Sequence, residues 1–315
     1  MKTNPKRIVI AGGSGFLGQA LAHHFLNGDW DVVVLTRSPG QSGWLGRQVG
    51  WDARTLGDWA REVEGAAAVI NLTGKSVNCR YNALNRKQIL ESRVNSTRVL
   101  GEAIGACAQP PPVWLNASTA TVYRHTFGEP WDETGKTEAT AEAKDRFSVE
   151  VAWAWERALN EASTLRTRKV AMRMAMVLGL GKNSVFPVLR RLARLGLGGR
   201  MGSGRQFVSW IHEADYCRSV EWLISHHDFG GPVNLVAPNP LPNAEMMRTL
   251  RQVCGVSFGL PATDGMLEVG AFVLRTETEL LIKSRRVIPG RLLQSGFTFH
   301  FPTIREAFEN LNKGT

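Results

Sequence analysis

The sequence predicts an α/β protein built on a doubly wound parallel sheet, with a smaller, partly discontinuous C-terminal α/β region. Strand-like and helix-like segments alternate through the first half of the chain, and the strand-like segments are apolar throughout. Such strands are typical of a parallel sheet that is covered by helices on both faces. The first strand also runs directly into Gly12, Gly15 and Gly18 and then into a helix, which makes the sheet Rossmann-type.

The elements of the first half can be placed by hydrophobic period and by flanking turn residues. In such a sheet a ligand binds outside the carboxyl ends of the strands, so we expect functional residues just after each strand. The predicted strands cover 7–11, 31–36, 47–51, 67–71, 113–117 and 169–174, and the predicted helices cover 15–27, 56–64, 84–108, 146–163 and 185–196.

After about residue 180 the alternation is less regular. The last helix is predicted over Ile304–Leu311, with Thr303 as its N-cap. The other elements expected there are strands over 207–211 and 233–236, a rigid loop over 238–242, and helices from near Glu213, over 243–254 and over 266–283. We therefore expect a nucleotide-binding domain over 1–180, with a return segment at about 207–236, and a substrate-side and C-terminal domain over 181–315.

Composition and charge narrow the class of partner. The net charge of +10 favours anionic partners, but the basic residues are dispersed, which argues against nucleic acid. No apolar run approaches the ~20 residues that span a bilayer, so no membrane is expected. The four cysteines are scattered and form no CxxC pair, which predicts neither a disulfide framework nor a metal site and fits a reducing cytoplasm.

The glycine turn has the outline of a dinucleotide-binding βα turn, and each glycine has a physical task. Gly12 allows the tight turn, Gly15 leaves room for a pyrophosphate, and Gly18 lets the helix pack close to the strand. The anion would bind the free backbone N–H groups at the start of the helix. We expect the turn to contact the cofactor through Gly12, Ser14, Gly15, Phe16, Leu17 and Gly18.

The end of the second strand indicates which dinucleotide is bound. An acidic side chain there would bond a ribose 2′-hydroxyl, whereas an arginine accommodates a 2′-phosphate. This chain has Thr36, Arg37 and Ser38 at that point, a guanidinium between two hydroxyls. The sequence therefore favours NADP(H); the alternative is that Arg37 is merely an exposed residue and specificity is set elsewhere.

Three segments together resemble the extended short-chain dehydrogenases/reductases. They are the glycine turn, Val69–Gly74, which looks like the segment that ends the family's fourth strand, and Asn116–Tyr123, which looks like the segment that supplies a catalytic hydroxyl. Aligning on Ala120–Tyr123 puts Thr119 at the position of that hydroxyl.

The chain is most similar to an atypical branch, the YfcH-like epimerase-family proteins with a C-terminal domain of unknown function. The resemblance spans essentially the whole chain and rests on Asn71–Gly74, Ser92-Arg93, Trp155-Glu156, Leu195–Gly199, Gly202–Gln206, Ser209–His212, Gly231–Asn234, Asn243–Glu245 and Val287–Pro289. It implies NADP(H) contacts at Thr36, Arg37, Leu72, Thr73, Gly74, Gln88, Arg93, Ser118 and Val177.

One departure from the superfamily concerns catalysis. Its usual members carry a Tyr and, four residues later, a Lys, so that the ammonium lowers the pKa of the phenol. The three tyrosines of this chain lack such a lysine, and alignment on Glu156 places Ser148 and Ala152 at the two positions. Either Thr119 or Tyr123 serves as the acid, or the substrate needs no strong acid, or the protein binds NADP(H) without hydride chemistry.

Further residues have competing interpretations. His212 and Asp215 could form a dyad, although a place for Asp215 in the first turn of a helix explains it as well. Arg205 resembles the arginine that contacts the substrate diphosphate in nucleotide-sugar enzymes, but it lies about three residues upstream of that position. Trp210, with Trp51 and Trp131, could shape a substrate pocket or belong to the core.

Two functions follow from these observations. The first is an NADP(H)-dependent oxidoreductase or epimerase that acts on a small anionic substrate such as a nucleotide sugar. The second is a non-catalytic protein that senses NADP(H). The superfamily often pairs through helices of the first domain, so a homodimer is a further expectation.

Overall fold

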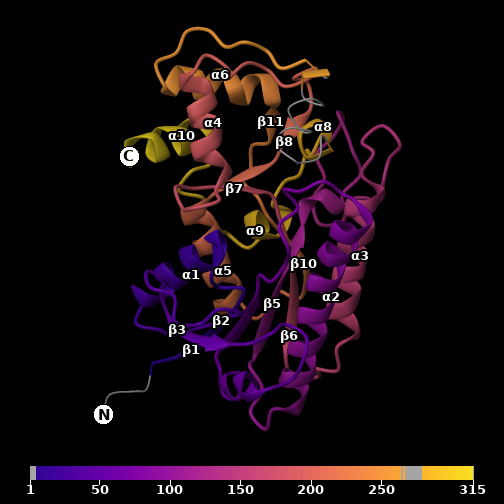
Figure 1. The fold of residues 1–315 in the computed structure, drawn as a ribbon, viewed down its shortest axis with the longest axis vertical. Coiled ribbons are helices and arrows are strands. Elements are labelled where there is room, and N and C mark those ends of the chain that lie inside the picture. The colour runs from indigo at the N-terminus through magenta and orange to yellow at the C-terminus, as the bar shows by residue number, and fades with distance from the viewer. Residues whose placement is uncertain (1–4, 264, 267–278, 315) are drawn as a thin grey trace.

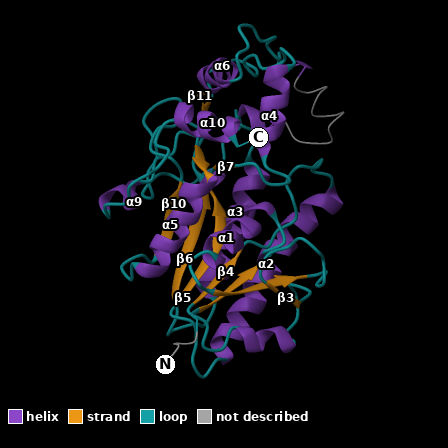
Figure 2. Ribbon diagram, turned by 90° about the vertical axis from the view of Figure 1, so that its left-hand side faces the viewer, coloured by secondary structure: helices purple, strands orange, loops and turns teal. Residues whose placement is uncertain are grey.

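Seven parallel strands form the central sheet of the protein. The computed structural model describes residues 5–263, 265–266 and 279–314. The strands lie in the order β10-β6-β5-β4-β1-β2-β3, so β4 is the central strand. Figure 2 shows the sheet with its strands in orange and helices around it. Their bounds are β1 Arg7–Ala11, β2 Asp31–Thr36, β3 Arg47–Gly50, β4 Ala68–Asn71, β5 Val113–Thr119, β6 Arg168–Met174 and β10 Gly231–Leu235.

Helices cover both faces of this sheet, as the apolar strands predict. In β1, Ile8 and Ile10 face a core that includes α1 (Phe16–Leu26) and α5 (Glu213–Ser225), whereas Val9 and Ala11 face a core under α2 (Ala83–Ala106). On the same face as α2, the helix α3 (Arg146–Glu161) packs on α2 (Figure 1). Burial on both faces follows from the two-residue period of a strand. The expected doubly wound α/β class is confirmed.

A second core lies beyond the carboxyl end of the sheet. There α6 packs between α4 and α10, around side chains that include Phe186, Met247 and Phe308 (Figure 1). Two short strand pairs support it, β7 with β9 and β8 with β11. The bounds are β7 Met176–Leu178, α4 Val185–Arg194, β8 Phe207–Val208, β9 Trp210–His212, β11 Leu241–Pro242, α6 Asn243–Val253, α8 Glu279–Ile282, α9 Gly290–Gln294 and α10 Ile304–Lys313.

Most predicted elements match within a few residues, and the last helix has its expected cap. Thr303 accepts a hydrogen bond from Glu306 N–H, and the Glu306 carboxylate accepts one from Thr303 N–H, a reciprocal capping box. The predicted helix over 56–64 is wrong in type, because η1, Asp58–Glu62, is a 3-10 helix. The predicted helix over 266–283 falls mostly outside the described residues, and α8 lies at its end.

The single strand predicted over 207–211 is also wrong, because it divides into β8 and β9 at Ser209. Its hydroxyl donates a hydrogen bond to Arg285 O at 2.8 Å and accepts one from Val287 N–H at 2.9 Å. Contacts with a segment nearly eighty residues away interrupt the strand. The short strands β7 and β11 and the helix α9 were not predicted, since too few residues carry each pattern. Among the described residues no helix has the length and apolar composition to cross a bilayer.

Candidate functional site

The glycine turn forms one wall of the candidate site. Gly12 has a φ of +74°, and a Cβ on Gly18 would lie 2.3 Å from the Cα of Gly13. A Cβ on Gly15, by contrast, would meet only the Gly12 carbonyl oxygen, at 3.6 Å. Two of the glycines are thus required by the fold, whereas Gly15 leaves an open approach to the backbone, which suits a pyrophosphate.

No side chain caps the helix that starts at this turn. The side chains of Phe16 and Leu17 pack inward, with the Phe16 ring against the segment after β7: a Cβ on Gly181 would lie 2.5 Å from it. Any contact of these two residues with an anion would therefore go through their backbone N–H groups.

The end of β2 presents a free guanidinium. Thr36 is buried, and its hydroxyl oxygen accepts a hydrogen bond from Ser38 N–H at 3.4 Å. Arg37 is exposed, and no hydrogen bond or ion pair within the described residues holds its side chain. An unpaired arginine beside the turn can bind an incoming phosphate without first breaking another contact.

The residues after β4 form the next wall. The backbone of Leu72 continues the strand pairing by donating to Ala11 O, and Thr73 N–H donates to Asn71 Oδ1. The Thr73 hydroxyl is buried and has no hydrogen-bond partner within the described chain. Because an unpaired buried hydroxyl is costly, this atom is where a bound ligand would supply the missing partner.

Arg93 lies behind that wall. It donates to the carbonyl oxygens of Lys75 and Ile89, both at 3.0 Å, and its guanidinium lies over the ring of Trp155. Burial lowers the pKa of Arg93 to about 10. A Cβ on Gly74 would lie 3.0 Å from Arg93 Cζ, so only a glycine fits against it.

Gln88 and Lys75 join α2 to the same loop. The Gln88 side chain accepts a hydrogen bond of 2.7 Å from Lys75 Nζ. Gln88 and Arg93 therefore hold the 74–75 loop in place, a role that the sequence did not indicate.

The end of β5 carries the predicted catalytic hydroxyls. Thr119 is partly buried, and its Oγ1 accepts the N–H of Thr121 at 3.1 Å, which caps the 3-10 helix η2 (Ala120–Val122). Ser118 donates a 2.6 Å hydrogen bond to Glu156, which also binds Arg173. The Ser118 hydroxyl is thus already used in a hydrogen bond to Glu156, whereas Thr119 is the last residue of the strand.

Tyr123 is fully buried and held at its hydroxyl. It donates to Asn234 Oδ1 at 2.8 Å and accepts from Arg173 at 2.9 Å. Burial, the largest influence, raises the pKa of Tyr123 to about 12 although Arg173 and Asn234 lower it. These contacts favour a structural role, and the assignment of Tyr123 as an acid stays a prediction.

A second buried charged group was not predicted at all. Lys283 pairs with Asp145 and donates to Thr121 O at 2.5 Å, while Ser148 donates to Glu279 Oε2 at 3.0 Å. Lys283 and Glu279 come from the C-terminal segment, whereas Asp145 and Ser148 lie at the start of α3. No pattern of spacing in the sequence connects residues so far apart.

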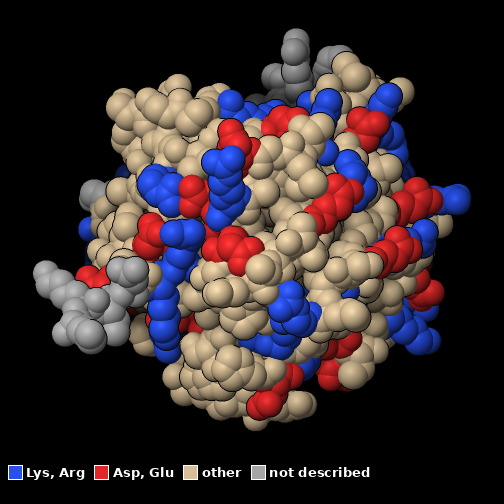
Figure 3. Space-filling view, turned by 90° about the horizontal axis from the view of Figure 1, so that it is seen from below, with Lys and Arg blue, Asp and Glu red and all other residues tan. Residues whose placement is uncertain are grey.

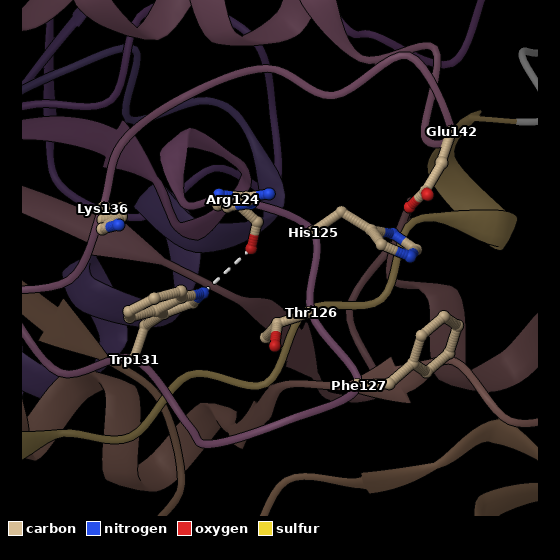
Figure 4. Close-up of a pocket in the computed structure, with 7 residues that line it drawn as sticks. All are labelled: Arg124, His125, Thr126, Phe127, Trp131, Lys136 and Glu142. Atoms are coloured by element: carbon tan, nitrogen blue, oxygen red, sulfur yellow. Dashed lines mark hydrogen bonds between the residues drawn. The ribbon is translucent and has the colours of Figure 1, made fainter.

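A cavity of about 370 Å³ opens beside this group, after the carboxyl end of β5. In Figure 4 the carboxylate of Glu142 points toward the ring of His125, and the Trp131 indole donates to Arg124 O. Arg205 does not line the cavity itself, but its guanidinium lies 5.7 Å from the ring centre of Phe127, which does. The cavity is lined by Arg124, His125, Thr126, Phe127, Trp131, Lys136 and Glu142.

The remaining predicted residues lie in the interior. Trp210 is fully buried in the second core and donates to Asn239 O, so its place in a substrate pocket is not supported; Trp51 is likewise core, in edge contact with Trp59. Trp131 does line the cavity. Val177 is buried on β7, where it pairs with Ile211.

The proposed dyad of His212 and Asp215 does not form as a hydrogen bond. Asp215 accepts the N–H groups of His300 and Phe301, each at 2.8 Å. His212 caps α5 by accepting Ala214 N–H at 3.0 Å. Both side chains thus fasten α5. No group of three or more His, Cys, Asp or Glu residues in the described ranges is placed to hold a metal ion.

Comparison with known proteins agrees with this geometry. The NAD dependent epimerase/dehydratase family matches residues 8–236. The chain belongs to this family. Residues 266–311 of this epimerase-family chain match a domain of unknown function, DUF1731, which confirms the predicted resemblance.

Its relatives extend over nearly the whole chain. The human epimerase family protein SDR39U1 is 29% identical over 308 residues, 97% of this chain and 99% of that protein. YfhF of Bacillus subtilis is 28% identical over 313 residues, 96% of this chain and 97% of that protein.

Solved structures give the same result. Human SDR39U1 (isoform2) with NADPH superposes with a TM-score of 0.85 and 28% identity, over 98% of this chain and 100% of that one. A nucleoside-diphosphate sugar epimerase from Corynebacterium glutamicum has a TM-score of 0.76 and 27% identity, over 98% of this chain and 58% of that one. Family and fold together assign a nicotinamide dinucleotide to this epimerase-family chain, and the open Gly15 and the unpaired Thr73 hydroxyl fit it.

Proposed function

We propose that the protein is an NADP(H)-dependent oxidoreductase or epimerase that acts on a small anionic substrate, with nucleotide sugars as the first class to test. The observation that carries the proposal is the free Arg37 guanidinium at the end of β2, on the same edge of the sheet as the glycine turn. The similar human protein has been solved with NADPH, which supports the same choice here.

Three groups would hold the cofactor. Arg37 would bind the 2′-phosphate, the N–H groups at the start of α1 would bind the pyrophosphate past Gly15, and Thr73 Oγ1 would gain a hydrogen bond. The bound nicotinamide supplies hydride, and the protein supplies binding, orientation and proton transfer.

The basic groups at the cavity support an anionic substrate. The Lys136 ammonium has no hydrogen-bond or ion-pair partner within the described chain, and Arg205 is exposed beside Phe127. Two cations, one of them over an aromatic ring, suit a phosphate joined to a planar or apolar group. Elsewhere the charges are mixed: Figure 3 shows Lys and Arg interspersed with Asp and Glu on the face seen from below.

The test is transfer of deuterium from labelled NADPH. The purified protein should move deuteride to a carbonyl compound in a panel that includes nucleotide-linked keto sugars and simple α-diketones. Arg205→Ala should raise KM for the nucleotide-linked compounds and leave the simple diketones unaffected. Tight NADPH binding with no transfer to any compound would contradict the proposal and favour a sensing role.

A further inference from the structure

The C-terminal segment places a carboxyl group where the superfamily usually has its catalytic phenol. Ser148, which aligns with that tyrosine, donates a 3.0 Å hydrogen bond to Glu279 Oε2. Ser148 lies in the first turn of α3, a helix that packs on β5 and on η2, which follows it. Glu279 therefore reaches from the C-terminal domain into the part of the first domain where an acid is expected and missing.

Only one oxygen of this carboxyl group is engaged. Glu279 is 6% exposed, and its Oε1 has no hydrogen-bond partner in the described part of the chain. Leaving a buried carboxyl oxygen unpaired is energetically costly. A substrate oxygen that shares a proton with Oε1 would remove this cost.

The charges around Glu279 suit a group that releases a proton. Burial raises the pKa of Glu279 above its usual range, against the opposing effects of the Ser148 hydrogen bond, Arg285 and Lys283; Asp145 adds to the rise. Burial thus makes it harder for this carboxyl group to ionise. Once it is ionised, the two cations stabilise the carboxylate.

These cations are themselves fixed. Lys283 is held by Asp145 and Thr121 O, and Arg285 donates to Thr121 Oγ1 at 3.1 Å. Thr121 lies two residues after Thr119, so the group is anchored to the end of β5. Asp145 pairs with Lys283, and the Ser148 hydroxyl donates its hydrogen bond to Glu279.

We infer that Glu279 is the catalytic acid of this protein, with Ser148 as its positioning residue, in place of the Tyr–Lys pair. In carbonyl reduction, the bound nicotinamide would supply a hydride to the carbonyl carbon. The C=O π pair would move to the carbonyl oxygen, and Glu279 Oε1 would give that oxygen its proton. The products are an alcohol, the oxidised nicotinamide and the Glu279 carboxylate, which regains a proton from water. The inference rests on the proposed function.

The first measurement needs no substrate. The infrared spectrum of the full chain at pH 7, with and without NADPH, should contain a carboxylic acid C=O band that Glu279→Gln removes. Glu150→Gln is the matched control, since Glu150 lies on the same helix as Ser148 but is exposed and paired with Arg146, and it should leave the band unchanged. If Glu279→Gln removes no such band, Glu279 is ionised and the inference fails.

The second measurement uses 2,3-butanedione and 9,10-phenanthrenequinone as probes. Glu279→Gln should keep NADPH affinity and folding but lower kcat about 10²- to 10⁴-fold, the usual effect of a lost general acid. Reduction by the unaltered chain should slow as pH rises through the pKa of Glu279. Ser148→Ala removes a hydrogen bond that lowers this pKa, so it should move the slowing to higher pH, an effect that a purely structural serine would not have.

The two proposals fail in different ways. An active chain whose Glu279→Gln variant is equally fast overturns the inference alone. A chain that binds NADPH but reduces no compound of the panel overturns the proposed function, and the assignment of Glu279 with it.

Discussion

Arg173 donates a hydrogen bond of 2.9 Å to the hydroxyl of Tyr123, and its guanidinium lies 5.0 Å from the centre of the tyrosine ring. Two further donor atoms of the same guanidinium bind Glu156, at 2.8 and 2.9 Å. The tyrosine hydroxyl also donates to Asn234, so it lies within a buried chain of hydrogen bonds that joins α3, β6 and β10. These contacts favour a structural role for Tyr123.

Tyr123→Phe should destabilise the protein by about 1–3 kcal/mol, because Arg173 and Asn234 each lose a buried partner. NADPH affinity and deuteride transfer should not change. Tyr216→Phe is the control, since the Tyr216 hydroxyl is buried with no hydrogen-bond partner among the described residues, and its removal should be neutral or stabilising. Urea unfolding measures both; a large loss of transfer in a stable Tyr123→Phe protein would restore its catalytic assignment.

Gly15→Ala and Gly18→Ala should have opposite effects. A methyl group on Gly15 meets open space, so stability should fall by less than about 1 kcal/mol, while NADPH affinity should drop roughly ten- to hundredfold. A methyl group on Gly18 would overlap Gly13, which should destabilise the fold by about 1–3 kcal/mol. Calorimetric titration and thermal unfolding distinguish the two. Unchanged NADPH affinity in Gly15→Ala would show that the pyrophosphate does not bind at this turn.

Arg37→Glu should weaken NADPH binding and leave NADH binding nearly unchanged. Losing hydrogen bonds to a charged phosphate costs about 1.5–3 kcal/mol, and the new carboxylate adds repulsion. Arg98→Glu provides a control at an exposed site on α2, where the arginine binds Glu102. Fluorescence titration with both cofactors gives the ratio, and equal losses for NADPH and NADH would refute the 2′-phosphate assignment.

Mild acid should destabilise the protein through His212. Its Nδ1 accepts Ala214 N–H and its Nε2 faces Asn310 Oδ1 at 3.2 Å, so the neutral ring is fully bonded. Burial lowers the pKa of His212 from 6.5 to about 4. Between pH 6.5 and about 4, His212 binds a proton in the unfolded chain but stays neutral in the folded chain. The contribution of His212 to the free energy of unfolding is therefore complete above pH 6.5 and falls as pH decreases toward 4.

The expected loss between pH 7 and pH 5 is about 2 kcal/mol. His212→Asn keeps an acceptor for Ala214 but cannot titrate in this range, so its stability should change less with pH. Urea unfolding at several pH values gives both slopes. Parallel slopes in the two proteins would show that His212 is not the group responsible.

The central sheet could be predicted because its signals are local. Each strand is a short apolar run between turn residues, and Gly12 and Gly18 have their positions set by backbone geometry. The N-cap at Thr303 could be predicted in the same way, because its partner Glu306 lies only three residues further along the chain. The break at Ser209 was missed because it depends on contacts with Arg285 and Val287, which no local pattern contains.

The sequence by itself determined the doubly wound sheet, the turn that receives a dinucleotide and the family to which the chain belongs, since these depend on residues that act near their own position. Only the tertiary structure decided that Tyr123 and Trp210 are buried, and that Ser148 meets Glu279, which lies 131 positions further along the chain. Burial and pairing of charges are properties of the packed chain, because desolvation depends on what surrounds a group in space. The residues proposed to bind the cofactor could therefore be named from the sequence, whereas the proposed proton donor could not.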